Sequence, residues 1–64
     1  MSVGGKIREA RKEAGMTQGE LAEKLGVYAK DICRWETEER MPSLQKFKEL
    51  CMCLKVSADQ LLDL

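Results

Sequence analysis

The 64-residue sequence contains no histidine, a single proline and only one each of tryptophan, tyrosine and phenylalanine. Histidine is the side chain most often used as a general base or a metal ligand near neutral pH. No arrangement of a nucleophile beside a base takes its place, and no glycine-rich phosphate loop is present. The sequence therefore predicts neither an enzyme nor a metal or cofactor site.

Cysteines and long apolar runs are also scarce. The three cysteines are an odd number, which disfavours a disulfide framework. Cys51 and Cys53 lie two apart on a predicted helix, so they point about 200° apart and cannot chelate one metal ion together. We expect reduced, buried thiols that pack as small hydrophobic side chains. Charged residues interrupt every apolar segment, so no membrane span is predicted. No signal peptide is visible, and we expect a cytoplasmic protein.

Helical spacing of apolar residues predicts an all-α fold in one domain, residues 1–64. Helices are expected over 4–14, from 17 to 26, over 29–36, from the cap Ser43 to 54, and briefly after Ser57. Thr17 and Ser57 each open a capping box, and Pro42 keeps the preceding residues in a loop. The inward stripes of the first and fourth helices are Ile7, Ala10 and Ala14, and Leu44, Phe47, Leu50, Cys51 and Leu54.

The most informative stretch, residues 17–36, reads as two short helices joined by a tight turn at Gly26. Such a pair is a helix-turn-helix unit, whose second helix can enter the major groove of DNA. The inward positions of both helices are apolar: Leu21, Ala22, Leu25, Ile32 and Trp35. We interpret Ile32 and Trp35 as core residues.

Six short motifs occur in order along the chain. They are Ile7-Arg8-Glu9-Ala10-Arg11, Gly15-Met16-Thr17-Gln18-Gly19-Glu20-Leu21-Ala22, Leu25-Gly26-Val27, Ile32-Cys33-Arg34-Trp35-Glu36, Pro42-Ser43-Leu44 and Leu50-Cys51-Met52-Cys53-Leu54-Lys55-Val56-Ser57. In this order and spacing the sequence resembles the phage-repressor and Cro-like helix-turn-helix family, also called the xenobiotic-response-element family, over residues 5–63. The resemblance implies a compact, five-helix, lambda-repressor-like domain that binds DNA.

The resemblance also implies roles for individual residues. The start of the recognition helix, residues 29–36, would face base edges, with Lys30 and Arg34 reaching guanine or phosphate. The alternative is that both are solvated surface charges. The residues expected to contact DNA are Gln18, Tyr28, Ala29, Lys30, Arg34, Thr37 and Arg40. Arg11 and Glu36 stand where family members form a partly buried ion pair, which would set the angle of the recognition helix.

Three positions depart from the family pattern. Thr37-Glu38 follows the tryptophan–glutamate pair where the family has a glycine-containing turn, so we expect that turn to adopt another geometry. Tyr28 replaces a serine or threonine before the recognition helix, and Ala29 replaces a base-reading glutamine or arginine. Glu38 and Glu39 would repel phosphate and are expected to point away from DNA.

Two functions remain open from the sequence. The first is a small transcriptional regulator, which the resemblance leads us to expect is a repressor. It would bind a palindromic DNA operator as a homodimer, with an interface built from the loop after the recognition helix and from Leu61, Leu62 and Leu64. The second is a protein-interaction module on the same fold, because eleven basic and eleven acidic residues leave no net positive charge. A basic face over Gln18, Lys30, Arg34 and Arg40 would favour the first.

Overall fold

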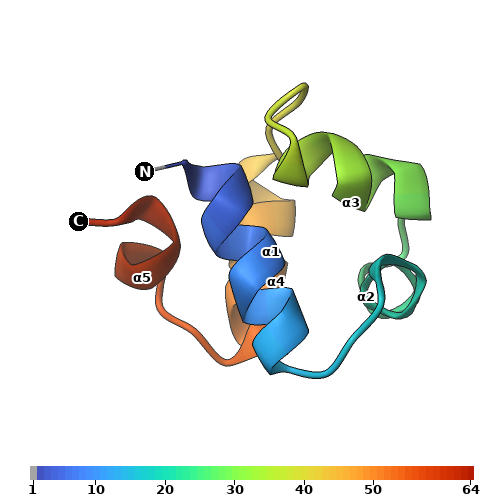
Figure 1. Ribbon diagram of the computed structural model, residues 1–64, viewed down its shortest axis with the longest axis horizontal. Coiled ribbons are helices and arrows are strands. Elements are labelled where there is room, and N and C mark those ends of the chain that lie inside the picture. Colours follow the sequence, from blue (N-terminus) through green and yellow to red (C-terminus); the bar gives the residue numbers. More distant parts are fainter. Residues whose placement is uncertain (1) are drawn as a thin grey trace.

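The computed structural model describes residues 2–64, and this part of the chain contains five helices and no strand (Figure 1). The helices are α1 (Val3–Glu13), α2 (Gln18–Leu25), α3 (Ala29–Glu36), α4 (Leu44–Leu54) and α5 (Ala58–Leu62). α2 and α3 lie to one side of α1, and α5 lies to the other (Figure 1). The predicted all-α, five-helix fold is confirmed.

Helix starts follow from short polar side chains. The hydroxyls of Ser2, Thr17, Ser43 and Ser57 each accept a hydrogen bond from the backbone N–H three residues later, which satisfies one of the free donors of a helix start. Both predicted capping boxes, at Thr17 and Ser57, are present. The cap at Ser2 moves the start of α1 to Val3, one residue earlier than predicted.

Helix ends use the left-handed backbone conformation. Gly15 has a φ of +73° and Gly26 a φ of +69°, and glycine adopts these values without a Cβ penalty. Lys55 has a φ of +57° at the end of α4, although the family pattern places glycine there. The left-handed region costs a side chain such as that of Lys55 about 1 kcal/mol or more.

The centre of the core takes one side chain from each helix. The five that are 2% exposed or less are Ile7, Leu21, Ile32, Leu50 and Leu61. The predicted placement of Ile32 and Trp35 in the core is confirmed, since Trp35 is 7% exposed. The predicted apolar stripes of α1 and α4 each included one terminal residue that the structure places outside the core. Ala14 is exposed because α1 ends at Glu13, and Leu44 is 86% exposed because helix side chains lean toward the N-terminus, here past the core.

The cysteines do not behave alike. Cys51 and Cys53 are half-buried and pack against the core, and burial raises the pKa of the Cys51 thiol, which keeps it protonated. Cys33 is exposed on α3, so the prediction of burial was wrong there. Residues 2–64 hold no group of three or more cysteine and carboxylate side chains that could bind a metal ion. No helix in this range is long and apolar enough to cross a membrane.

Candidate nucleic-acid interface

The unit formed by α2, the turn at Gly26 and α3 presents the outer face of α3 to solvent. Gly26 reverses the chain, and the N–H of Val27 donates to the carbonyl oxygen of Ala22 at 3.0 Å, which closes the turn. Ile32 and Trp35 face inward from α3, whose opposite side no other helix covers (Figure 1). The helix-turn-helix predicted over residues 17–36 is therefore present.

The first turn of α3 is exposed and held by a single side-chain cap. The Tyr28 hydroxyl makes no cap bond, but the Asp31 carboxylate accepts a hydrogen bond from the N–H of Tyr28 at 2.9 Å. The Tyr28 side chain is 73% exposed, and the Lys30 ammonium lies 5.7 Å from the centre of its ring, within the range of a cation–π contact. Tyr28, Ala29 and Lys30 thus form one accessible group.

The last turn of α3 is held by an ion pair from α1. The Nε and Nη2 of Arg11 donate to the two carboxylate oxygens of Glu36, at 2.7 and 3.2 Å, and the side chains are only 9% and 3% exposed. The hydrogen bond with Glu36 raises the pKa of Arg11, so the guanidinium stays charged despite desolvation. Its Nη1 also donates to the carbonyl oxygen of Met16 at 2.9 Å. The fork geometry is the strong, bidentate form of such a pair.

Gln18 adds α2 to this ion pair. Its Nε2 donates to an oxygen of Glu36 at 3.0 Å, so the carboxylate of Glu36 joins α1, α2 and α3 at one point. A contact of the Gln18 side-chain amide with DNA would then use the other N–H of that amide. The capping box at Thr17 uses the N–H groups of residues 17 and 20, whereas those of Gln18 and Gly19 donate no hydrogen bond within residues 2–64 and are available to an external anion.

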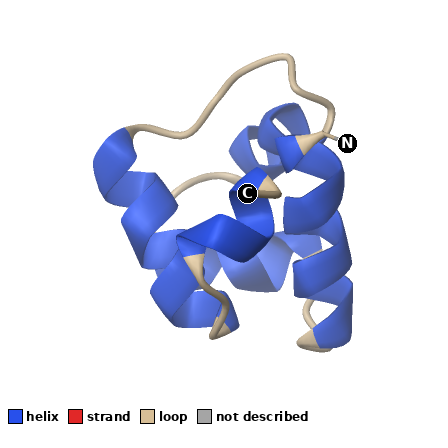
Figure 2. Ribbon diagram, turned by 90° about the vertical axis from the view of Figure 1, so that its left-hand side faces the viewer, coloured by secondary structure: helices blue, strands red, loops and turns tan. Residues whose placement is uncertain are grey.

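Gly4 lets α1 approach the end of α3 closely. A Cβ at Gly4 would lie 2.4 Å from the carbonyl oxygen of Glu36, a distance that real Cβ contacts do not reach. The loop after α3, residues 37–43, then arches over this end of the molecule beside the start of α1 (Figure 2). Only glycine fits here without a backbone shift.

The turn after α3 keeps the left-handed geometry that the family pattern reserves for glycine. Glu38 has a φ of +65°, so the expectation of another geometry was wrong. Its carboxylate accepts a hydrogen bond from the N–H of Gly4 at 3.3 Å, which places a negative charge on the positive end of α1. This capping interaction offsets the backbone cost of a side chain at residue 38.

The loop folds back onto Arg34. The carbonyl oxygen of Arg34 accepts hydrogen bonds from the N–H groups of Glu39 and Arg40, at 2.9 and 3.2 Å, and from the Thr37 hydroxyl at 3.3 Å. The Glu39 carboxylate lies 3.7 Å from the Nε of Arg34. Glu39 thus lies beside a candidate DNA contact, and the expectation that it points away from DNA stays a prediction. Helical periodicity could not place it, because Glu39 follows the helix.

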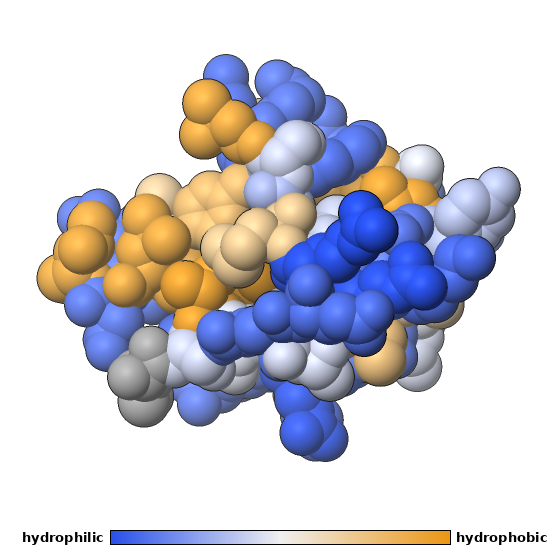
Figure 3. Space-filling view, turned by 90° about the horizontal axis from the view of Figure 1, so that it is seen from above, coloured by the Kyte–Doolittle hydropathy of each residue, from blue (hydrophilic) through white to orange (hydrophobic). Residues whose placement is uncertain are grey.

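The residues expected to contact DNA therefore fall into two groups at the two ends of α3. Tyr28, Ala29 and Lys30 lie at its start, and Arg34, Thr37 and Arg40 lie at its end and in the loop. Gln18 reaches the second end through Glu36. Seen from above, the most hydrophilic residues gather on the side of α3, and apolar residues gather on the side of α5 and the chain ends (Figure 3).

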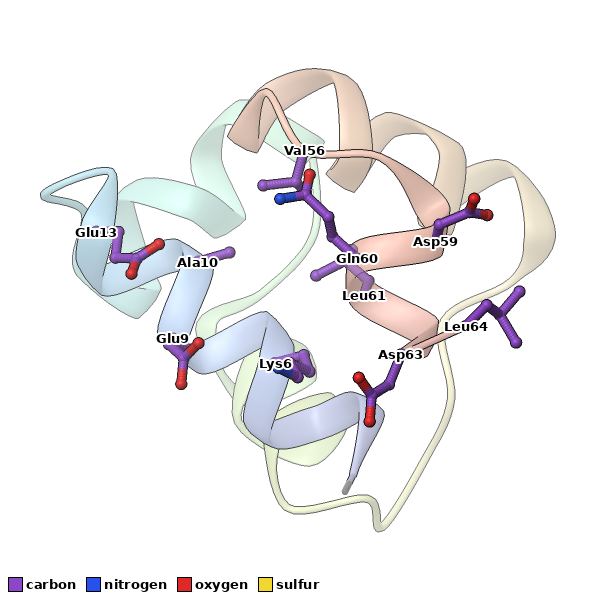
Figure 4. Close-up of a pocket in the computed structure, with 10 residues that line it drawn as sticks. All are labelled: Lys6, Glu9, Ala10, Glu13, Val56, Asp59, Gln60, Leu61, Asp63 and Leu64. Carbon is purple, nitrogen blue, oxygen red and sulfur yellow. The ribbon is translucent and has the colours of Figure 1, made fainter.

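A hollow on the opposite side of α1 has the wrong charge for a phosphate. It lies between α1 and α5, has a volume of about 330 Å³, and is drawn in Figure 4. Four carboxylates line it, against the single ammonium of Lys6: Glu9, Glu13, Asp59 and Asp63. No basic excess surrounds α3 either, because residues 29–40 hold three basic side chains, Lys30, Arg34 and Arg40, against four acidic ones, Asp31, Glu36, Glu38 and Glu39. The candidate interface therefore depends on individual exposed cations and not on a broad basic face.

The five helices and the exposed second helix of the turn define a helix-turn-helix domain. The helix-turn-helix family model matches residues 7–61. The chain belongs to this family.

Two curated relatives carry names of the same kind. The chain is 39% identical over 62 residues to the HTH-type transcriptional regulator ImmR of Bacillus subtilis, an alignment that covers 97% of the chain and 49% of ImmR. It is 53% identical over 38 residues to an uncharacterized HTH-type transcriptional regulator of Methanothermobacter thermautotrophicus, covering 59% of the chain and 55% of that protein. The chain spans about half the length of these relatives.

Two solved structures share the fold over nearly the whole chain. The P22 c2 repressor, solved in complex with synthetic operator 9T, matches with a TM-score of 0.90 and 31% identity over 95% of this chain and 92% of that one. SinR, described as the master regulator for biofilm formation and solved in complex with DNA, matches with a TM-score of 0.86 and 37% identity over 95% and 98%. The likeness therefore includes sequence as well as fold.

Proposed function

We propose that this domain binds double-stranded DNA sequence-specifically and acts in a transcriptional regulator, as a repressor that occupies an operator. The observation that carries the proposal is α3, whose exposed first turn is free to meet base edges while its last turn is fixed to α1 and α2. The DNA-bound structures of the P22 c2 repressor and SinR support it. Such a regulator would act in the cytoplasm, together with the DNA that it binds.

Each candidate residue has a role that suits its chemistry. The Arg34 guanidinium can donate to both acceptors on the guanine edge, and the Lys30 ammonium can donate to guanine or phosphate. The Ala29 methyl can pack on a thymine methyl, and the Tyr28 ring can lie against a sugar. Gln18, Thr37 and Arg40 would donate to phosphates and fix the register on the duplex.

We further propose that two copies bind a palindromic operator, with half-sites about 34 Å apart, which is one turn of DNA. One copy alone offers few contacts, and two give useful affinity and specificity. Leu62 and Leu64 are 40% and 89% exposed and can serve the contact between copies, together with the loop after α3. Leu61 is 2% exposed and belongs to the core, so its predicted place in this contact is withdrawn.

Fluorescence anisotropy with a pool of random duplexes at two salt concentrations, followed by selection of the bound fraction, tests the proposal. We expect a palindrome to be enriched and the affinity to fall with salt, with a slope that reports the phosphates neutralised. Lys30→Ala should weaken binding, whereas Lys48→Ala, an exposed lysine on α4, should not. Absence of binding at low salt, or equal binding by both variants, would contradict the proposal.

A further inference from the structure

The loop after α3 fixes the position of Glu39 relative to Arg34. Backbone N–H groups of Glu39 and Arg40 both donate to the carbonyl oxygen of Arg34, at 2.9 and 3.2 Å. The Thr37 hydroxyl donates to the same oxygen at 3.3 Å. Because this turn is closed by backbone bonds, the Glu39 side chain starts from a defined point beside the Arg34 side chain.

The carboxylate meets Arg34 at one edge of its guanidinium. The Oε2 of Glu39 lies 3.7 Å from the Nε of Arg34, and the two side chains are 67% and 39% exposed. Within residues 2–64 no hydrogen bond uses the terminal amino groups of Arg34, Nη1 and Nη2. These are the two donors that a bidentate contact with guanine can use.

We propose that Glu39 is a specificity-determining residue for DNA recognition by Arg34. Its carboxylate forms an exposed ion pair at the Nε edge and so favours the side-chain orientation in which Nη1 and Nη2 point together at one base. This inference rests on the proposed DNA-binding function. A long side chain that is already ordered loses less conformational entropy on binding. The gain in affinity is about 2- to 12-fold per ordered side chain.

The negative charge of Glu39 also weakens binding wherever Arg34 finds no guanine. The phosphate backbone repels a carboxylate whatever the DNA sequence, which lowers the affinity for every duplex. This lost affinity is recovered only at a site where Nη1 and Nη2 of Arg34 both donate hydrogen bonds to a guanine. A bidentate contact discriminates against a wrong base by roughly 5- to 150-fold. Glu39 therefore lowers the affinity for DNA of any sequence and raises the preference for one base pair.

Glu38 supplies a matched control in the same loop. Glu38→Gln removes the same charge, one residue away, but residue 38 contacts the N–H of Gly4 and not Arg34. A glutamine carbonyl oxygen can still accept that hydrogen bond. Loss of charge alone should thus affect both variants equally, whereas loss of orientation should affect only Glu39→Gln.

The test uses the operator that the wild type selects. The base pair read by Arg34 is defined as the one whose preference is lost in Arg34→Ala. Affinities for the operator and for the duplex changed at that pair are then measured for the wild type, Glu39→Gln and Glu38→Gln. We expect both variants to bind the changed duplex more tightly, and only Glu39→Gln to lose about 3- to 10-fold of the discrimination ratio.

Each outcome has a distinct meaning. Equal ratios for the wild type and both variants would overturn the role of Glu39 and leave DNA binding intact. No base preference lost in Arg34→Ala would also overturn it. If the wild type enriches no sequence at all, the proposed function fails, and the inference fails with it. Thermal unfolding of each variant checks the fold, which these exposed substitutions should preserve.

Discussion

The two ends of the recognition helix differ in how they are held. The first turn of α3 carries Tyr28, Ala29 and Lys30 in solvent, with one cap bond from Asp31. The last turn is fixed by Arg11 and Gln18 through Glu36, and by the close approach of Gly4. Side chains from α1 and α2 thus hold the last turn of α3, whereas Tyr28, Ala29 and Lys30 are exposed and can be exchanged with little effect on the fold.

The largest expected effect on stability is at the fixed end. Arg11→Met or Glu36→Gln leaves a buried group without its partner, and each should lower the free energy of unfolding by about 3 kcal/mol. Chemical denaturation of the single and double variants gives the coupling energy. We expect the double variant to lose about 2 kcal/mol less stability than the sum of the losses in the two single variants. Simple additivity would contradict a role for this pair in joining α1 to α3.

Two glycines at the second position of their helices give a sharper comparison. Gly4→Ala should destabilise by about 2 kcal/mol, because its Cβ would lie 2.4 Å from the carbonyl oxygen of Glu36. Gly19→Ala, whose Cβ would have its nearest neighbour at 3.9 Å, should stabilise by about 0.5 kcal/mol. Thermal unfolding measures both. A neutral Gly4→Ala would mean that α1 and α3 tolerate a wider separation.

Glu38 and Lys55 both have a left-handed backbone conformation, so variants at these two positions distinguish the cost of backbone strain from the benefit of helix capping. Lys55→Gly should stabilise by about 1 kcal/mol, since it removes strain alone. Glu38→Gly should change stability little, because relief of strain is offset by loss of the bond to Gly4. Glu38→Ala keeps the strain and loses the bond, and should destabilise by about 1 kcal/mol. Equal stabilisation by both glycine variants in urea unfolding would exclude the capping role.

Local signals in the sequence predicted most of the fold. Caps at Thr17 and Ser57 and the apolar spacing around Ile32 and Leu50 depend on residues three or four apart, and the structure has them. Stripe ends were less predictable, because exposure of Leu44 depends on where the core stops. Burial of Cys33 was wrongly expected, since a small apolar side chain can lie on either face of a short helix.

The sequence predicted the helices that form the candidate site but not the contacts of the loop after α3. The resemblance to the family implied the pair of Arg11 with Glu36, which the structure has, and the candidate DNA contacts, which stay predictions. The contacts of Glu38 with Gly4 and of Glu39 with Arg34 arise from the path of the loop, which carries no periodic pattern. Their acidic character alone suggested repulsion from DNA, although each carboxylate has a partner within the protein.

The most direct test exchanges the free end of α3. Ala29→Gln with Lys30→Gln changes two exposed side chains of the first turn, so the free energy of unfolding should stay within about 0.5 kcal/mol of the wild type. Selection from the same random duplex pool should enrich a different base at one or two positions of each half-site. Enrichment of the wild-type sequence by this stable variant would contradict the claim that the first turn of α3 reads the DNA.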